Sequence, residues 1–320
     1  MHRRQLLAAA AALPVLAQAQ PAWPSRPIRL IVPFPPGGPN DIIARLYAQP
    51  LTATLGQPVV IENRPGAGGV LGVDAAAKAP PDGHSLVLTS SGALVIIPHV
   101  TNTVPYNVPQ DLTPVSIVTL VPEALVVAPS LGVTDLAGLR ALARRPGTHL
   151  AIGTAGAAGI SHLAAEMLRL KSGMELTVVP YRGAAPAVTD LLGGQIQLLF
   201  ADLPVVLPHL RSGALRALML ASTRRSPALP NLPTTAEAGL PEVLADNWYS
   251  LLGPAGLPVT VVERLSAALK EASEVPAVRD SLREQGATAH WTSPEAFAAT
   301  IAEESARWRR VAEAAHIRLD

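Results

Sequence analysis

The segment PFPPGGPNDIIARLYA has the residue types of an anion site at the point where a strand meets a helix. Gly37 and Gly38 follow an apolar run, and Pro39, Asn40 and Asp41 begin the helical pattern. Glycines let a backbone approach a ligand closely, and the free N–H groups at a helix start attract a carboxylate. An ordinary tight turn, with Asp41 stabilising the helix start, explains the same residues. The local sequence leaves both interpretations open.

A second junction, HLAIGTAGAAGISHLAAEML, runs from an apolar stretch through Gly153, Gly156 and Gly159 to a helical pattern near Ser161. These glycines are three residues apart, and no acid ends a second strand at the distance that dinucleotide binding requires. The segment NRPGAGGVLG also lacks the third glycine of that fingerprint. We therefore expect neither NAD nor any other cofactor.

A third junction lies at Tyr181, Arg182 and Gly183. Arg182 could pair with an anion in a cleft, or it could be a solvated loop charge. Asp202 ends the next apolar run and could accept a hydrogen bond from a ligand amine or hydroxyl. Taken alone, Asp202 is better explained as the cap of a helix that begins near Pro204.

Catalytic and metal motifs are not found in this sequence. His162 and Glu166 have a metal-ligand spacing on a helix, but the H-E-x-x-H pattern and a third ligand are missing, so we predict no metal site. Nothing matches G-x-S-x-G, S-x-x-K or the P-loop. An enzyme would have to use His162 with Asp202 or Asp41, and we predict that the protein is not an enzyme.

The N-terminus predicts export. Arg3 and Arg4, an apolar run and the triplet Ala17-Gln18-Ala19 form a secretory signal peptide, residues 1–19. The arginine pair leaves the twin-arginine route and the ordinary secretory route both open. No later stretch is apolar enough to span a bilayer, so we expect a soluble protein of the periplasm.

Composition excludes several other classes of protein. Removing the signal lowers the formal charge from +1 to −1, which gives no electrostatic reason to bind nucleic acid. The absence of cysteine excludes disulfides, cysteine-bound zinc and thiol catalysis. A chain of this length with 49% hydrophobic residues can form two domains with large cores.

Apolar runs of strand length alternate with helical patterns along the chain, which predicts an α/β fold with mainly parallel sheets. Strands are expected at 28–34, 59–63, 85–90, 124–129, 149–154, 176–181, 196–202 and 215–222. Helices are expected at 40–55, 67–78, 135–145, 160–171, 184–193, 259–273 and 294–315.

Two Pro-rich or polar stretches, 98–122 and 223–247, bracket a block of four strand and helix units. This arrangement predicts one lobe from 20–122 plus 248–320, a second lobe from 123–247, and a hinge where the chain crosses twice. A hinge between two lobes produces a cleft that can close on a ligand.

Several long motifs in order resemble the substrate-binding receptors of tripartite tricarboxylate transporters, also called Bug proteins, over essentially all of the mature length. They are PFPPGGPNDIIAR, VIENRPGAGGVLG, PDGHSLVLTSSG, SHLAAEML, VPYRGAAPAVTDLLGGQIQLLFADLP, LRALMLASTRRSPALPNLPTTAEAGLP and NWYSLLGPAGLP. The resemblance implies the type II periplasmic-binding-protein fold, two α/β lobes joined by a hinge that close on a small organic acid. Backbone amides and bridging waters are expected to hold the acid.

The resemblance also implies a set of ligand-binding residues from both lobes. They are Phe34, Gly37, Gly38, Asp41, Ser90, Ser91, Thr154, Ala155, Gly156, Ser161, His162, Tyr181, Arg182, Gly183, Asp202 and Tyr249, with Trp248 beside the last. The chain departs from the family in having Ala155, Ala157 and Ala158 where relatives carry more polar residues. The family also often places its acid at the position of Ala201, which leaves the role of Asp202 open.

The resulting prediction is a monomeric receptor that delivers a small carboxylate to membrane transporter subunits. A receptor that presents the same acids to a signalling partner is an alternative, and an enzyme on the same fold is a further one. Arg182 is the one arginine or lysine among the matched residues, which favours a monocarboxylate or a zwitterion over citrate.

Overall fold

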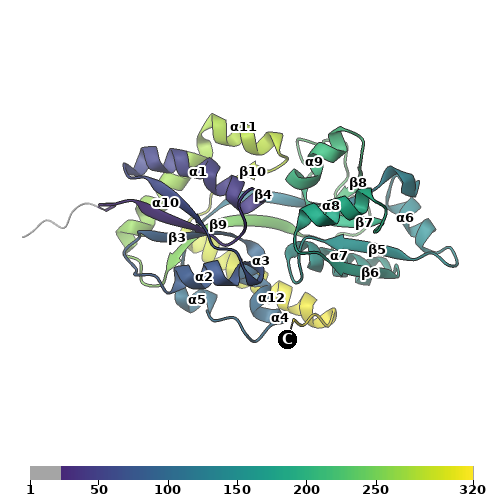
Figure 1. The fold of residues 1–320 in the computed structure, drawn as a ribbon, viewed down its shortest axis with the longest axis horizontal. Coiled ribbons are helices and arrows are strands. Elements are labelled where there is room, and N and C mark those ends of the chain that lie inside the picture. The colour runs from purple at the N-terminus through teal and green to yellow at the C-terminus, as the bar shows by residue number, and fades with distance from the viewer. Residues whose placement is uncertain (1–22, 320) are drawn as a thin grey trace, which may run out of the picture.

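The structure, a computed structural model, describes residues 23–319 and shows two sheets side by side, each covered by helices (Figure 1). The predicted signal peptide lies outside the described residues. The predicted α/β fold is confirmed. None of the helices in residues 23–319 combines the length and the apolar character that a bilayer span needs.

The first sheet has the strand order β2-β1-β3-β9-β4, and β1 runs parallel to both β2 and β3. Of its first three strands, β1 and β3 are apolar and largely buried, whereas the edge strand β2 is partly exposed. Their bounds are β1 (Ile28–Val32), β2 (Val59–Asn63) and β3 (Ser85–Ser90). Two long strands complete it, β4 (Leu112–Val127) and β9 (Asp246–Pro254), with the short β10 (Thr288–Ala289) paired to β4.

The second sheet has the order β4-β7-β5-β6, with β8 also paired to β4. Strand β5 runs parallel to β6 and β7, so these three strands end at one edge. Their bounds are β5 (Leu150–Thr154), β6 (Leu176–Pro180), β7 (Leu198–Asp202) and β8 (Arg216–Leu220).

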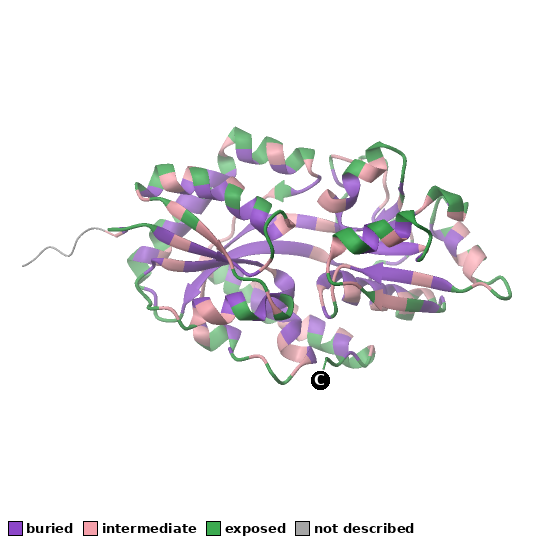
Figure 2. Cartoon of the chain, viewed as in Figure 1, coloured by how far each residue is buried: buried purple, intermediate pink, exposed green. Residues whose placement is uncertain are grey.

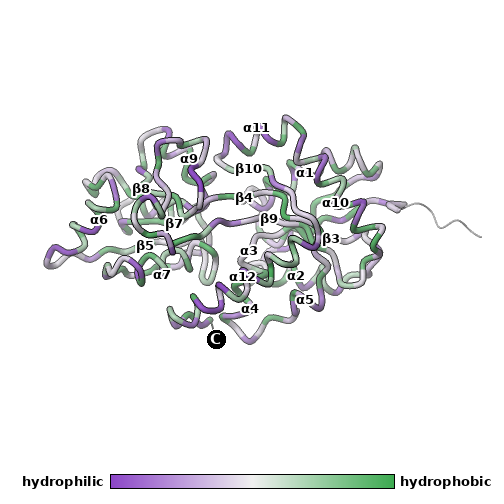
Figure 3. Tube along the Cα trace, turned by 180° about the vertical axis from the view of Figure 1, so that it is seen from behind, coloured by the Kyte–Doolittle hydropathy of each residue, from purple (hydrophilic) through white to green (hydrophobic). Residues whose placement is uncertain are grey.

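Strand β4 belongs to both sheets because it changes partners in its middle. Pro122 pairs with Asp246 of β9, and the next residue, Glu123, pairs with Asp202 of β7. Figure 3 shows from behind that β4 and β9 run between the two halves of the molecule. We call the first sheet with its helices lobe 1 and the second sheet with its helices lobe 2.

The prediction of mainly parallel sheets is wrong, since β4 and β9 run antiparallel to their neighbours. Continuous apolar runs report burial on both faces of a sheet, and burial does not depend on strand direction. The sequence analysis also predicted no strand for β9 or for residues 112–123 of β4, where Pro114 and Pro122 are typical of a loop.

In lobe 1, the helices α1, α10 and α11 lie on one face of the sheet, and α2, α3 and α12 lie on the other. Their bounds are α1 (Pro39–Leu55), α2 (Val70–Ala77), α3 (Ser91–Val95), α10 (Val259–Glu274), α11 (Pro276–Glu284) and α12 (Pro294–Ala314). Short helical segments lie at η1 (Ala67–Gly69), α4 (Ile97–Val100) and α5 (Val108–Asp111). Figure 2 shows buried strands between helices that are exposed on their outer sides.

In lobe 2, α8 (Ala184–Leu192) and α9 (Leu203–Arg211) cover one face, while α6 (Leu136–Ala143) and α7 (Ile160–Ser172) cover the other, with η2 at Pro129–Leu131. Helix α12 contacts α3 of lobe 1 and α7 of lobe 2. Its Trp308 is completely buried, and Phe297 packs edge to face on Trp248 at 5.5 Å. Buried aromatic side chains contribute strongly to packing, so α12 fastens both lobes to the crossing strands.

Candidate functional site

The carboxyl ends of the parallel strands in the two lobes face each other. Ser90, the last residue of β3, pairs with Tyr249 of β9, close to the point where β4 reaches Asp202 at the end of β7. A Cβ atom added to Gly92 of lobe 1 would lie 3.8 Å from the Cα atom of Gly159 of lobe 2. The strand-to-helix junctions noted in the sequence therefore lie at the ends of the two lobes that face each other.

In lobe 1, the loop before α1 is held by Asp41. The carboxylate of Asp41 accepts hydrogen bonds from Gly37 N at 2.9 Å, Arg45 Nε at 2.9 Å and Asn63 Nδ2 at 3.0 Å. Burial alone would raise the pKa of Asp41, but the bonds from Arg45, Gly37 and Asn63 lower it to about 2. Asp41 is only 3% exposed, so its carboxylate acts as a clamp on the loop within lobe 1.

The helix that follows this loop begins without a side-chain cap. Gly38 is the N-cap of α1 and has no side chain that could cap the helix. Pro39 occupies the first helical position. Gly37 has φ of +80°, a left-handed conformation that favours glycine. Since the first N–H groups of a helix have no partner within it, the N–H groups of Asn40 and Asp41 are available at the α1 N-terminus. Phe34 lies behind the loop, against Gly69.

In lobe 2, the loop of residues 155–159 is held by side chains from the first turn of α7. Ser161 Oγ accepts from Ala155 N at 2.9 Å, and His162 Nδ1 accepts from Ala158 N at 2.8 Å. Burial lowers the pKa of His162, which keeps the ring neutral and Nδ1 able to accept, while Glu166 opposes this effect. Ser161 and His162 thus shape the loop.

Two further features constrain the backbone of this loop. Ala158 has φ of +53°, which few residues other than glycine adopt, and the bond to His162 fixes it. Thr154, fully buried at the end of β5, donates to Gly156 O at 3.2 Å. Gly159 is the N-cap of α7 and provides no side-chain cap, so the N–H groups of the first turn of α7 are available as well.

The junction after β6 contributes a third uncapped helix start. Gly183 is the N-cap of α8, without a side-chain capping bond. Tyr181 donates its hydroxyl hydrogen to Asp190 Oδ2 at 2.7 Å, and burial together with Asp190 raises the pKa of Tyr181 to about 12. The Tyr181 hydroxyl is therefore engaged inside lobe 2, whereas Arg182 is exposed.

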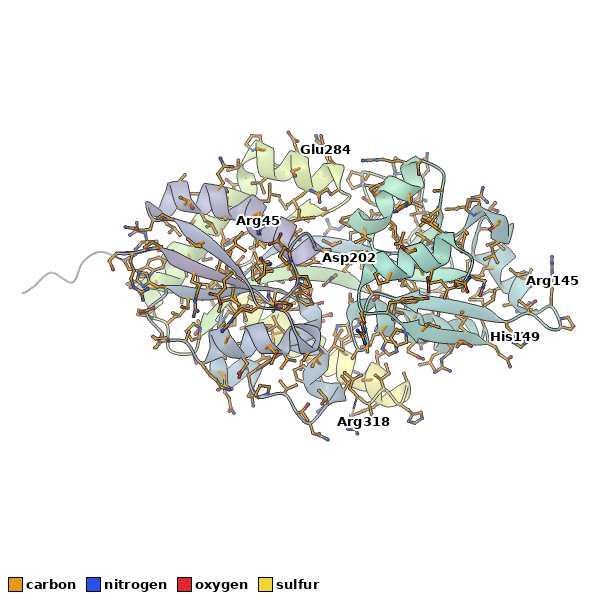
Figure 4. All side chains as sticks on the ribbon, in the orientation of Figure 1. Arg45, Arg145, His149, Asp202, Glu284 and Arg318 are labelled. Carbon is orange, nitrogen blue, oxygen red and sulfur yellow. The ribbon has the colours of Figure 1, made fainter. Side chains whose placement is uncertain are left out.

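Asp202 lies between the lobes (Figure 4) and joins a buried polar network. Its Oδ2 atom accepts from Tyr249 Oη at 2.6 Å, and its Oδ1 atom accepts from Asn247 Nδ2 at 3.1 Å. Ser91 of α3 extends the network by donating to Asn247 Oδ1 at 2.9 Å. The interpretation of Asp202 as the cap of α9 is wrong: Asp202 occupies the N-cap position, but its carboxylate makes no capping bond.

Sequence reasoning missed two members of this network, Glu123 and Asn247. Glu123 is 1% exposed and hydrogen-bonded to Asp202. A lone acid in the apolar run PEALVVAP was a signal, because a buried charge is expensive unless it is paired or neutral. Ala201, the neighbouring position that the resemblance pointed to for an acid, is fully buried in the apolar core of lobe 2.

An apolar groove adjoins the N-terminus of α1. It has a volume of about 220 Å³ and reaches from α1 across β4 to the start of α9. Its lining is apolar apart from Gln285 and consists of Gly37, Pro39, Ile42, Ile43, Val121, Pro204, Val205, Leu282, Gln285 and Ala287. Both lobes contribute to it, so its width depends on their relative position.

Residues 23–319 contain no group of three or more His, Asp or Glu side chains arranged to hold a metal ion. His162 Nε2 is 4.0 Å from Glu166 Oε1, and the Glu166 carboxylate accepts from Arg169 Nε at 2.7 Å. Glu166 therefore already has an arginine partner on its own helix.

Comparisons with known proteins agree on one family. Residues 43–317 match the family model described as the tripartite tricarboxylate transporter family receptor. The chain is 42% identical over 291 residues to the protein BugT of Bordetella pertussis, covering 90% of this chain and 89% of the relative.

Solved structures of similar proteins include two with bound acids. A Rhodopseudomonas palustris protein, Rpa4515 with adipate, superposes with a TM-score of 0.86 at 35% identity, covering 92% of this chain and 99% of the other. MatC of the same organism, with bound malate, gives a TM-score of 0.81 at 33% identity, covering 90% and 99%. The family and these structural neighbours are solute-binding proteins rather than enzymes.

Proposed function

Because the chain belongs to the tripartite tricarboxylate transporter family of receptors, we propose that it captures a small organic acid in the cleft and delivers it to a membrane transporter. The site of action is the periplasm, after removal of residues 1–19. The observation that carries the proposal is the pair of uncapped helix starts, α1 in lobe 1 and α7 in lobe 2, at the facing ends of the two lobes.

Each helix start supplies fixed backbone donors to an anion. The aligned peptide dipoles place about half a positive charge at a helix N-terminus. A carboxylate there accepts hydrogen bonds from N–H groups that have no other partner. The loops that lead into α1 and α7 are already clamped by Asp41, Ser161 and His162. These loops are therefore preorganised, and binding a ligand costs little further conformational entropy.

The two-lobed arrangement supports closure as the mechanism. We place the hinge where β4 passes from Pro122 to Glu123 and where β9 returns near Asn247, which divides the chain at 122/123 and 247/248. A ligand that contacts both helix starts binds the closed form better than the open form and shifts the population toward it.

The donors favour an acid with one or two carboxylates. Two opposed helix starts match the two ends of a dicarboxylate, the class to which the adipate and malate bound by two relatives belong. A third carboxylate would need another cation, and Arg182 is the one arginine or lysine among the predicted site residues. The apolar groove beside α1 favours a ligand with an aliphatic or aromatic body.

The direct test is a thermal-shift screen of the mature chain, residues 20–320, against monocarboxylates, dicarboxylates, tricarboxylates, amino acids and aromatic acids. A ligand at 100 times its dissociation constant should stabilise the protein by about 2.7 kcal/mol. We expect a shift with one mono- or dicarboxylate class, abolished in Gly38→Trp, whose side chain would cover the α1 N-terminus. No shift with any acid, from protein shown by denaturing mass spectrometry to carry no retained ligand, contradicts the proposal.

The transporter partner requires its own experiment. The tagged mature chain, saturated with the acid found in the screen, is mixed with detergent-solubilised membranes of the source organism. Recovery of integral transporter subunits only in the presence of the acid supports delivery to a transporter. Recovery of a sensor kinase instead would assign the receptor to signalling.

A further inference from the structure

The crossing point of the lobes contains two acidic side chains that have no basic partner among residues 23–319. Glu123 of β4 and Asp202 of β7 are cross-strand neighbours, and they are 1% and 9% exposed. Neutral groups surround them: Tyr249 and Asn247 on β9 bond to Asp202, and Ser91 on α3 bonds to Asn247. Two adjacent carboxylates cannot both remain ionised in such a place.

Hydrogen-bond directions show which of the two acids carries the proton. Asp202 accepts from the hydroxyl of Tyr249 and from the amide of Asn247, so it is used as a carboxylate. Within the described chain, no N–H or O–H group donates to the buried Oε2 atom of Glu123. The bond between Glu123 and Asp202 then requires that Glu123 donates a hydrogen of its own.

We propose that Glu123 and Asp202 form a proton-binding site at the crossing of the lobes, and that the bound proton holds the lobes in the relative position of this structure. The network joins Ser91 of lobe 1 to Asp202 of lobe 2 through Asn247 and Tyr249. Loss of the proton leaves two charges side by side at the point where β4 changes sheets. Their repulsion and their need for water separate the strands there.

The electrostatic environment agrees with this assignment. Burial, together with Asp202, raises the pKa of Glu123 well above its ordinary value. Burial also raises the pKa of Asp202, while its bonds to Tyr249, Asn247 and Glu123 lower it. No lysine, arginine or histidine in the described residues is among the groups that act on either acid.

Asp246 is a further acid on β9, adjacent in sequence to Asn247. It interacts with Ser222, Thr223 and Arg307. Neither Glu123 nor Asp202 is among the groups that act on Asp246, whose pKa is raised by burial.

The sign of the pH effect follows from the raised pKa of Glu123. Between its ordinary and its raised pKa, the folded protein binds one more proton than the unfolded chain, so stability falls as pH rises. The contribution is complete below pH 4.5, the ordinary pKa of a glutamate, and disappears as pH passes the raised value. None of this depends on a ligand, so the inference stands apart from the proposed function.

The test compares unliganded wild type with Glu123→Gln. Glutamine has the shape of a protonated glutamate and donates to Asp202 without a proton to lose. From pH 6 to pH 9, we expect the wild type to lose several degrees of melting temperature and to gain radius of gyration in small-angle scattering. Both changes should be much smaller in Glu123→Gln, whereas Glu274→Gln, an exposed acid on α10, should behave as the wild type.

Identical pH profiles for the wild type and Glu123→Gln would overturn the proposal. If Glu123→Gln does not fold, infrared spectroscopy of the wild type decides the question. The carbonyl stretch of a protonated carboxyl group should be present at neutral pH and disappear at alkaline pH with the melting temperature. Its absence at neutral pH also rejects a bound proton.

Discussion

The loop before α1 in lobe 1 and the loop before α7 in lobe 2 share one backbone plan but are held by different chemistry. Each leads to a glycine N-cap, Gly38 or Gly159, without a side-chain cap. In each, the first helical turn reaches back to hold the loop. Lobe 1 uses the charged carboxylate of Asp41, whereas lobe 2 uses the neutral Ser161 and His162.

This difference bears on both charge and pH. Asp41 adds a negative charge beside the α1 N-terminus, which Arg45 partly offsets, while neutral clamps leave the α7 dipole unopposed. The α7 start should therefore be the stronger anion site. The low pKa of Asp41 keeps the lobe 1 clamp intact in mild acid, where the imidazole of lobe 2 begins to take up protons.

The largest expected effect comes from removing the charged clamp of lobe 1. Asp41→Ala deletes the acceptor of three hydrogen bonds and should lower the free energy of unfolding by roughly 2–3 kcal/mol, because bonds to buried charges are strong. Urea denaturation measures this loss. Asp74→Ala is the matched control, since Asp74 also pairs with a basic residue four positions later. It should cost about 1 kcal/mol or less, and equal losses would show that Asp41 does not clamp the loop.

A second substitution tests the helix starts as anion sites. Gly159→Asp supplies α7 with a charged cap that competes with the ligand, so affinity should fall about tenfold or more, while stability changes by only about 0.5 kcal/mol. A Cβ at Gly159 has open space around it. Gly159→Asn caps the helix without the charge and should lose less affinity.

The matching substitution in lobe 1, Gly38→Asp, tests whether the α1 start is the weaker anion site. Gly38→Asp should weaken binding less than Gly159→Asp, because Asp41 already places a negative charge beside that terminus. Isothermal titration calorimetry with the acid from the screen compares the variants. A larger loss for Gly38→Asp would reverse the ranking of the two anion sites.

A smaller effect is expected from the neutral clamp of lobe 2. Protonated His162 cannot accept from Ala158 N, and burial lowers its pKa from 6.5. Its contribution is present above pH 6.5 and is lost as pH falls through the lowered value, with an amplitude of about 1 kcal/mol.

His162→Asn retains an acceptor that does not titrate, so it should lose less stability than the wild type between pH 7 and pH 5. His99 and His290 also have lowered pKa values, so the informative quantity is the difference between wild type and variant. His149→Gln, at the exposed far end of lobe 2 (Figure 4), is the control. Parallel profiles for His162→Asn and the wild type would argue against an imidazole clamp.

Much of the fold was predictable because burial leaves a strong signal in sequence. The runs at 85–90 and 149–154 coincide, to within one residue, with the buried strands β3 and β5. Strand direction and the two crossing strands were not predictable in the same way. Prolines at 114 and 122 are typical of loops, yet both lie within β4, whose pairing is irregular near Pro114.

Some residues of the candidate site were predictable from short segments, and others depend on how distant strands pair. Glycines at strand-to-helix junctions are local features, so Gly37, Gly38 and Gly159 could be found from short segments. The environment of Asp202 depends on the register of β4 with β7 and on β9, which bring Glu123 and Asn247 to it from distant parts of the chain. No short segment contains that information, and the capping interpretation failed for this reason.

The smallest expected effect concerns the charge that lobe 2 adds near the cleft. Arg182 is exposed, so an ion pair between its side chain and a ligand is screened by water. If backbone donors at α1 and α7 hold the acid, Arg182→Gln should weaken binding less than about fivefold. Arg145→Gln, on the far end of lobe 2 (Figure 4), should leave affinity unchanged. A loss beyond tenfold for Arg182→Gln, diminishing at high salt, would mean that closure brings the guanidinium onto the ligand, and lobe 2 would then bind by side-chain charge as well as by its helix start.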